Sequence, residues 1–172
     1  MNRQLILIVL IGCFTASAFA ASGWETNFKR AAKKADRKDR YMLLDFTGSD
    51  WCIWCLKLNK EVFDKSDFKD YARKNLILVE VDFPRNKRQS RSLENQNADL
   101  ASKYGIRGYP TIVILAPDGT LVAKTGYKRG GAEKYIAHLE KLIANYEKGP
   151  YKDGDDEDRK NERGGNRDDG DR

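Results

Sequence analysis

Short apolar runs separated by turn residues are the clearest pattern along this chain. A run of about four to eight apolar residues that ends in Gly, Pro, Ser or Asp is typical of a buried β-strand. Pro and Gly in Ala116–Gly119 also favour a hairpin turn between the last two runs. The predicted strands are Tyr41–Phe46, Leu76–Asp82, Thr111–Leu115 and Leu121–Thr125.

Other segments repeat apolar residues every three or four positions, which predicts helices that bury one face. Trp24, Phe28, Ala31, Ala32 and Ala35 share the first such face, and the last helix is closed by Gly149-Pro150. A polar stretch, Arg85–Asn97, precedes one short helix. The remaining predicted helices are Leu56 to about Asp64, Ser66 to about Lys74 with the Ser66 hydroxyl as a cap, Ala98–Tyr104, and Tyr135–Tyr146.

The order of these elements is typical of an α/β fold. Strands that alternate with helices pair in parallel, and the late hairpin adds an antiparallel edge. We therefore predict a mixed central β-sheet with helices on both faces.

The N-terminus has the pattern of a secretory signal peptide. Arg3 supplies the positive charge, Leu5–Phe14 the apolar stretch, and Ala18-Phe19-Ala20 a small-x-small cleavage site. Cleavage near Ala20 would deliver a periplasmic or secreted protein. Leu10–Cys13 also fits the spacing of a lipoprotein signal, so a lipid anchor on Cys13 is the minor alternative.

Composition divides the chain into three parts, a signal peptide (1–20), one domain (21–150) and a charged tail (151–172). From Lys152 onwards no side chain is apolar, and such a segment cannot bury enough surface to fold, so we expect disorder there. The tail is acidic, so the basic excess of the chain lies in Lys29–Arg40 and Arg85–Arg91. A solvated helix face and a solvated loop are the favoured explanations of these two basic runs. An acidic partner or an anionic envelope surface is the alternative, and nucleic acid fits poorly without interleaved aromatic residues.

Removing the signal leaves two cysteines, Cys52 and Cys55, three positions apart. A disulfide that closes so short a loop stabilises little, so redox chemistry is the better explanation. Cys52 follows a strand and a Gly-Ser-Asp turn, where a helix start would favour its thiolate and make it the nucleophile. Cys55, nearly one turn later, can resolve the mixed disulfide. A zinc site needs two more ligands, and only His138 is available, so no metal or cofactor is expected.

Two motifs make the chain resemble the thioredoxin superfamily over about residues 24–148. Leu44-Asp45-Phe46 followed by Trp51-Cys52-Ile53-Trp54-Cys55 resembles the strand, turn and active-site helix, and Tyr104–Thr111 resembles the loop that carries a cis-proline. The resemblance implies a cis Pro110 beside the sulfurs, with the backbone of Tyr109 free to pair with substrate. It also makes Asp45 a buried carboxyl that accepts the proton of Cys55, although the turn here is one residue longer. Trp51 is expected to pack beside the site.

The residues between the cysteines depart from thioredoxin, which has Gly-Pro there. Ile53-Trp54 lacks the His of strongly oxidising relatives, which argues against a strong oxidant, and Trp54 could influence partner choice. The polar stretch Arg85–Asn97 is longer than in thioredoxin and either contacts a partner or is a solvated insertion. We expect His138 to be solvated.

We therefore predict an exported thiol–disulfide oxidoreductase of the bacterial thioredoxin-like type. Its substrate-binding residues would be Trp51, Ile53, Trp54, Tyr109 and Pro110. It would reduce disulfides of envelope or secreted proteins as a monomer and be re-reduced by a membrane or envelope electron donor. Two alternatives stay open: a disulfide oxidase or isomerase, and a non-catalytic peptide-binding module.

Overall fold

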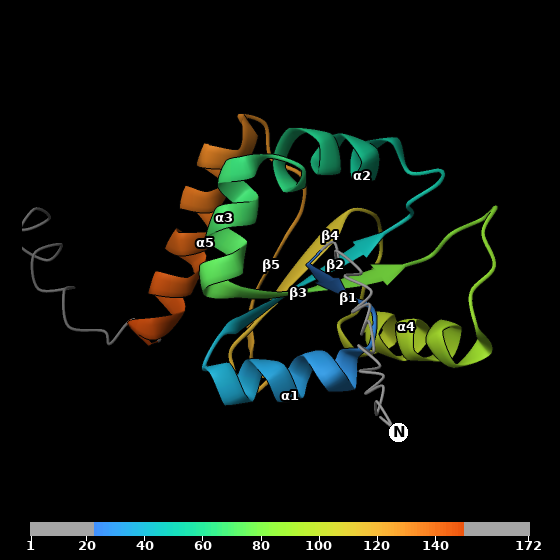
Figure 1. Cartoon of the computed structure of the whole chain (residues 1–172), viewed down its shortest axis with the longest axis horizontal. Coiled ribbons are helices and arrows are strands. Elements are labelled where there is room, and N and C mark those ends of the chain that lie inside the picture. Colours follow the sequence, from blue (N-terminus) through green and yellow to red (C-terminus); the bar gives the residue numbers. More distant parts are fainter. Residues whose placement is uncertain (1–22, 150–172) are drawn as a thin grey trace, which may run out of the picture.

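The apolar runs form strands of one mixed five-stranded sheet, seen at the centre of Figure 1. The structure is a computed structural model that describes residues 23–149, so the predicted signal peptide, Cys13 and the predicted tail lie outside it. The strands are β1 (Trp24–Glu25), β2 (Tyr41–Thr47), β3 (Leu76–Asp82), β4 (Thr111–Leu115) and β5 (Leu121–Thr125). The α/β class and the mixed sheet predicted from the sequence are confirmed.

The sheet has the strand order β1-β3-β2-β4-β5. β2 and β3 pair in parallel over their full length, from Tyr41 opposite Leu76 to Thr47 opposite Asp82. β4 runs antiparallel to β2, and β5 forms a hairpin with β4. Gly119 has φ 88° in the turn of that hairpin, a conformation that favours glycine. Because β2 and β3 end at the same edge, the segments that follow them meet there.

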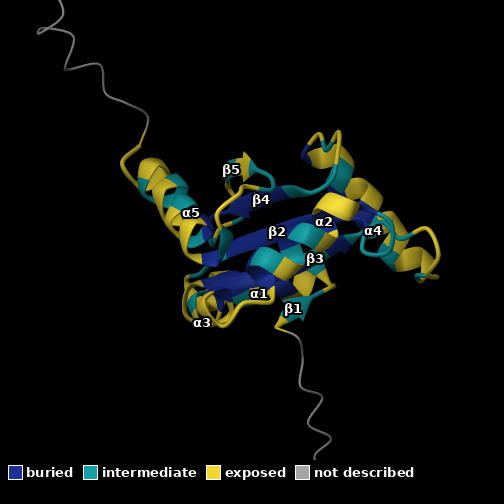
Figure 2. Cartoon of the chain, turned by 90° about the horizontal axis from the view of Figure 1, so that it is seen from above, coloured by how far each residue is buried: buried dark blue, intermediate teal, exposed yellow. Residues whose placement is uncertain are grey.

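Helices cover both faces of the sheet, as Figures 1 and 2 show. One face packs against α2, α3 and α5 around Leu43, Leu78 and Ile114, and the other packs against α1 and α4 around Leu44, Val79 and Val113. Both faces of β2 are therefore buried, as expected for a parallel strand between helices. The helices are α1 (Phe28–Lys38), α2 (Ile53–Leu58), a π-helical segment (Asn59–Phe63), α3 (Ser66–Asn75), α4 (Arg91–Lys103) and α5 (Gly131–Glu147).

Trp24 does not belong to the first helix, which corrects the prediction. The Asn27 side chain accepts the N–H of Arg30 at 2.9 Å and caps α1, so the helix begins at Phe28. Trp24 lies in β1 instead, and its ring packs 5.1 Å from that of Phe63 on the other face of the sheet. The helical spacing of Trp24 was coincidental.

The prediction for the polar stretch Arg85–Asn97 was also wrong in part, because α4 begins at Arg91. Ser90 caps this helix by accepting the N–H of Leu93 at 3.3 Å. The inward face of the helix includes Asn97, a polar residue that is only 1% exposed. A polar residue on the buried face hid the helical pattern.

Two smaller predictions differ from the structure after the cysteines. The segment that ends near Asp64 is not one α-helix, because a π-helical turn over Asn59–Phe63 follows α2. Ser66 is the first residue of α3, and the residue before it, Lys65, occupies the cap position without a side-chain hydrogen bond. The Ser66 hydroxyl therefore does not cap α3.

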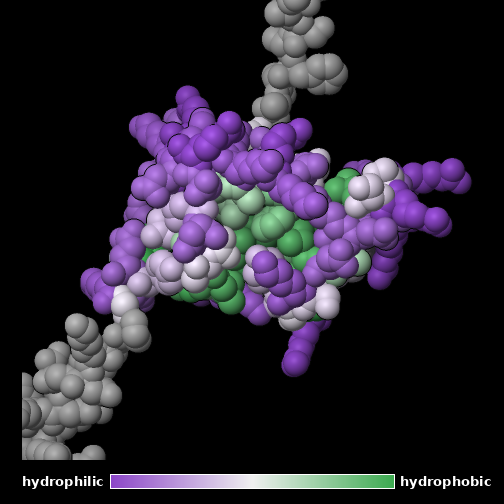
Figure 3. Space-filling view, turned by 90° about the horizontal axis from the view of Figure 1, so that it is seen from below, coloured by the Kyte–Doolittle hydropathy of each residue, from purple (hydrophilic) through white to green (hydrophobic). Residues whose placement is uncertain are grey.

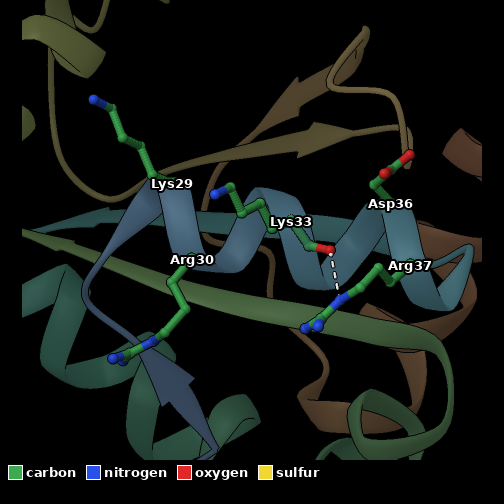
Figure 4. Close-up of a pocket in the computed structure, with 5 residues that line it drawn as sticks. All are labelled: Lys29, Arg30, Lys33, Asp36 and Arg37. Carbon is green, nitrogen blue, oxygen red and sulfur yellow. Dashed lines mark hydrogen bonds between the residues drawn. The ribbon is translucent and has the colours of Figure 1, made fainter.

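The basic run Lys29–Arg40 lies largely on α1, on the opposite side of the sheet from α2. Figure 4 shows Lys29, Arg30, Lys33 and Arg37 extending from this helix. Glu25 binds the Arg30 guanidinium, and its other oxygen lies 3.1 Å from Lys34 Nζ. Figure 3 shows an apolar area bordered by hydrophilic side chains on the α1 side of the molecule. No helix within residues 23–149 is long and apolar enough to span a bilayer.

We expect Asn97→Ala to destabilise the domain. The buried Asn97 amide donates to the carbonyl oxygen of Asp82 at 2.9 Å and so ties α4 to the end of β3. Its loss should lower the free energy of unfolding by about 1–2 kcal/mol, measured by urea denaturation. Asn95→Ala, an exposed change on the same helix, is the control and should have little effect. Equal stabilities of the two variants would contradict this assignment.

Candidate active site

The two cysteines lie at the start of α2, directly after the edge where β2 ends. Cys52 is the N-cap residue of α2, and its Sγ accepts the N–H of Cys55 at 3.2 Å. The two residues form a disulfide with their Cα atoms 5.2 Å apart. Cys52 is 6% exposed and Cys55 is 2% exposed, so the first sulfur is the more accessible to a partner.

Hydrogen bonds fix the turn between β2 and Cys52 onto the end of β3. The Asp82 carboxylate accepts the backbone N–H of Ser49 at 2.8 Å and its hydroxyl at 2.6 Å. The Asp50 carboxylate accepts the backbone N–H groups of Arg85 and Asn86 at 3.0 and 2.7 Å. The beginning of the basic loop is therefore bound to the turn that presents the cysteines.

Trp51 packs beside the disulfide-bearing turn, where it contacts three segments. Its indole N–H donates to the carbonyl of Phe83 at 2.8 Å, and the Arg85 guanidinium lies 3.9 Å from its ring centre. A Cβ on Gly48 would come within 2.5 Å of the indole, so a glycine is needed for this close approach. Arg85, the first residue of the polar stretch Arg85–Asn97, is thus in contact with the site, while residues 85–88 are exposed.

The loop before β4 brings Tyr109 and Pro110 to the same edge. The Tyr109–Pro110 peptide bond is cis, the form implied by the resemblance to thioredoxin. The Tyr109 ring packs edge-on against Trp51 with centres 5.7 Å apart, and lies 5.3 Å from the Phe83 ring. Three aromatic rings therefore join the turn, the loop after β3 and the cis-proline loop.

Exposed apolar side chains flank the disulfide on α2. Ile53 is 74% exposed and Trp54 is 48% exposed, unusual values for large apolar groups. The Trp54 ring lies 5.5 Å from that of Tyr127, and Lys57 Nζ lies 5.4 Å from the Trp54 ring centre. Tyr127 donates its hydroxyl hydrogen to Glu61 at 2.6 Å, which fixes the tyrosine beside α2.

Asp45 is buried on the α2 side of the sheet. It is 4% exposed, and its Oδ1 has no hydrogen-bond partner among the described residues. Burial, followed by the charges of Glu80 and Asp82, raises the pKa of Asp45 to about 8. Cys55 and Leu58 point inwards from the same side of α2, and Leu58 packs in the cluster that contains Leu43, two residues before Asp45 on β2. Asp45 therefore lies on the face of β2 that α2 covers, and Cys55 is buried on that helix.

The structure brings all the predicted site residues to one edge of the sheet and adds several that the sequence analysis did not identify. Arg85, Phe83, Tyr127, Glu61 and Glu80 are the additions, and they come from segments whose local patterns carry no redox signal. His138 was predicted to be solvated, but it is partly buried on α5 and shares a 2.9 Å hydrogen bond with Thr125. Within residues 23–149, no three His, Cys, Asp or Glu side chains are grouped to hold a metal ion.

Comparisons with known proteins agree with this geometry. The profile of the thioredoxin-like domain family matches residues 28–143. The disulfide bond reductase DsbH of Chlamydia pneumoniae is 32% identical over 70% of this chain and 72% of its own length. The thioredoxin-related protein DsbJ of the same organism is 26% identical, and the matched region spans about a third of DsbJ, 36% of its length. A solved structure of a DsbH oxidoreductase superposes with a TM-score of 0.67 at 31% identity and covers 70% of this chain and 83% of the other.

The raised pKa of Asp45 predicts that stability falls as the pH rises. Between about pH 4 and 8 the unfolded carboxyl is ionised while the folded one keeps its proton, so the folded state loses relative stability with increasing pH. Asp45→Asn removes the ionisable group and therefore this pH dependence of stability. With the disulfide intact, the variant should gain about 2–4 kcal/mol relative to the wild type between pH 4 and 8, measured by urea denaturation.

Asp99→Asn, which removes an exposed carboxyl from α4, is the control for this series. It should reproduce the pH dependence of the wild type. Parallel stability curves for the wild type and Asp45→Asn would show that the carboxyl of Asp45 does not titrate differently in the folded and unfolded states.

Proposed function

Because the chain belongs to the thioredoxin-like domain family and is a thiol–disulfide oxidoreductase, we propose that it is an exported reductase of protein disulfides. The observation that carries the proposal is the Cys52–Cys55 disulfide at the start of α2, next to the cis peptide bond before Pro110. The reductase name of the 32% identical relative supports the reducing direction. The signal pattern of residues 1–20 supports export.

The proposed reaction begins with Cys52 as the nucleophile. In the reduced protein its thiolate attacks one sulfur of a substrate disulfide, and the second substrate sulfur leaves as a thiolate that takes up a proton. Cys52 is the more exposed of the pair, and its Sγ receives the N–H of Cys55, a contact that favours the thiolate.

Cys55 then resolves the mixed disulfide. Near and above pH 8, where the Asp45 carboxyl ionises, the Cys55 thiol transfers a proton to it, and the Cys55 sulfur bonds to Cys52 Sγ while the remaining substrate sulfur leaves. The substrate gains two electrons and the protein is left with the Cys52–Cys55 disulfide. A dithiol donor of the membrane or envelope must return the electrons.

Substrate would bind over the exposed face of α2 and the cis-proline loop. Ile53 and Trp54 offer apolar surface next to Cys52, and Tyr109 has backbone groups beside Pro110 that an extended segment can pair with. The hydrogen bond from the Trp51 indole to the Phe83 carbonyl holds Trp51 in place beside this surface. The partners are therefore disulfide-containing exported proteins that present an extended segment.

Trapping tests this function. In the full-length chain, Cys55→Ser should accumulate mixed disulfides with exported proteins, because the resolving sulfur is gone while the nucleophile remains. Cys52→Ser is the matched control and should trap none. A reduction potential near about −270 mV supports a reductase, whereas one near about −120 mV indicates an oxidase. If Cys55→Ser forms no mixed disulfide under reducing or oxidising conditions, the enzymatic function is wrong.

Trp54→Ala separates binding of protein substrates from thiol chemistry. The exposed indole is held against Tyr127 and Lys57, so a protein partner can pack on it without an ordering cost. The variant should lose about tenfold in kcat/KM for a protein disulfide and change less than about twofold for a small aromatic disulfide.

Leu121→Ala removes a similarly exposed apolar side chain, and Leu121 begins β5 opposite Leu115, at the end of β4 remote from Pro110. It should change neither rate. Equal losses of Trp54→Ala for both substrates would assign Trp54 to the chemical step instead of partner binding.

A further inference from the structure

Two carboxyl side chains face each other in the sheet behind the cysteines. Side chains alternate along a strand, so Asp45 shares the face of Leu43, and Glu80 shares that of Leu78. Leu43 and Leu78 belong to the same cluster, on the side covered by α2 and α5, and Asp45 and Glu80 are direct register partners in the parallel pair. Neighbouring strands lie about 4.7–4.9 Å apart, so the two carboxyls are near neighbours.

The surroundings of this pair do not neutralise two negative charges. Burial, followed by the charge of Asp82, raises the pKa of Glu80, and Lys87 is a weaker opposing influence. Tyr135 of α5 is close enough to Asp45 that, after burial, the charge of Asp45 raises the pKa of Tyr135. Cys55 is buried on α2, which covers the same side of the sheet. Neither of these side chains is a cation. Like charges at such a distance in a partly buried site favour the uptake of one proton by the pair.

Asp82 has a different role from the other two carboxyls. Both of its oxygens accept hydrogen bonds from Ser49, so this carboxylate holds the turn before Cys52. Asp82 lies opposite Thr47 at the carboxyl end of the two strands, whereas Asp45 lies two residues before that end on β2. Glu80 lies at the level of Asp45 on the neighbouring strand and is half-buried, so it is the more exposed carboxyl of the two.

We propose that Asp45 and Glu80 form a carboxyl pair that holds at most one proton behind Cys55, and that Glu80 thereby controls proton transfer from the Cys55 thiol to Asp45. This inference rests on the proposed function, in which Asp45 accepts that proton. Glu80 is a positioning residue, because it acts through Asp45 and does not touch the sulfurs in the reaction. As Cys55 attacks Cys52 Sγ, the bond from Cys52 to the substrate sulfur breaks and the Cys55 proton moves to Asp45. Both carboxyls are ionised before this transfer, and the negative charge of Glu80 makes Asp45 the stronger base.

The attack by Cys52 and the resolution by Cys55 can be followed separately with a small aromatic disulfide as substrate, because its thiolate leaving group is coloured. Attack by Cys52 of the reduced full-length protein releases one thiolate, and resolution by Cys55 releases the second. In Glu80→Gln, the pH midpoint of the second release should move down by about one unit, because the neighbouring negative charge is gone. In Asp45→Asn the second thiolate release should lose this pH dependence. The double variant with Glu80→Gln should release the second thiolate as Asp45→Asn does.

Glu94→Gln is the matched control, since it removes the same charge from α4 on the other face of the sheet, and it should leave the midpoint unchanged. An unchanged midpoint in Glu80→Gln, together with loss of the step in Asp45→Asn, overturns the carboxyl pair but leaves the proposed function intact. Absence of the first thiolate release in the wild type overturns the proposed function itself.

Carboxyl ¹³C NMR titration of the wild-type protein tests the pair without a substitution. Asp45 and Glu80 should each show two titration steps with shared midpoints, because protonation of one changes the other. Independent single-step titrations of the two carboxyls would overturn the proposal even if Glu80→Gln did not fold.

Discussion

The parallel pairing of β2 with β3 is the constraint on which the rest of the site depends. The register from Tyr41–Leu76 to Thr47–Asp82 ends both strands at one edge, so the turn before Cys52 meets the loop after Asp82. Asp82 then binds Ser49, and Trp51 binds the carbonyl of Phe83. A shift of this register by one residue would turn the side chains to the opposite face and separate these partners.

The same register places a polar pair within an otherwise apolar interior. Leu43 and Leu78 pack in the core, but two positions further along each strand stand Asp45 and Glu80. Within residues 23–149 the Oδ1 of Asp45 has no hydrogen-bond partner, and burial of such a carboxyl lowers stability at neutral pH. A destabilising residue directly behind a redox disulfide is a common feature of functional sites, where pKa values are shifted for chemistry.

Surface properties differ between the two sides of the sheet. The basic side chains of α1 extend from the side away from the disulfide, whereas exposed apolar side chains on α2 surround Cys52. Lys57 and Arg85 lie over the aromatic rings of Trp54 and Trp51, so the apolar surface near the sulfurs carries positive charge. This thiol–disulfide oxidoreductase thus combines the fold of its family with an exposed Ile53-Trp54 pair between the two cysteines, where thioredoxin has Gly-Pro.

The sequence by itself determined the cysteine pair and four of the strands, because strand runs and C-x-x-C spacing are local patterns. The cis-proline loop was implied by the resemblance to the thioredoxin superfamily. Local patterns gave the wrong element where contacts distant in sequence determine the structure. Trp24 lies in β1, which pairs with β3, and the buried Asn97 side chain donates to the Asp82 carbonyl. Only the tertiary structure brought Arg85 to Trp51, Tyr127 to Trp54 and Glu80 to Asp45. Sequence separation hides such neighbours, since strand register and packing of loops fix them after the chain has folded.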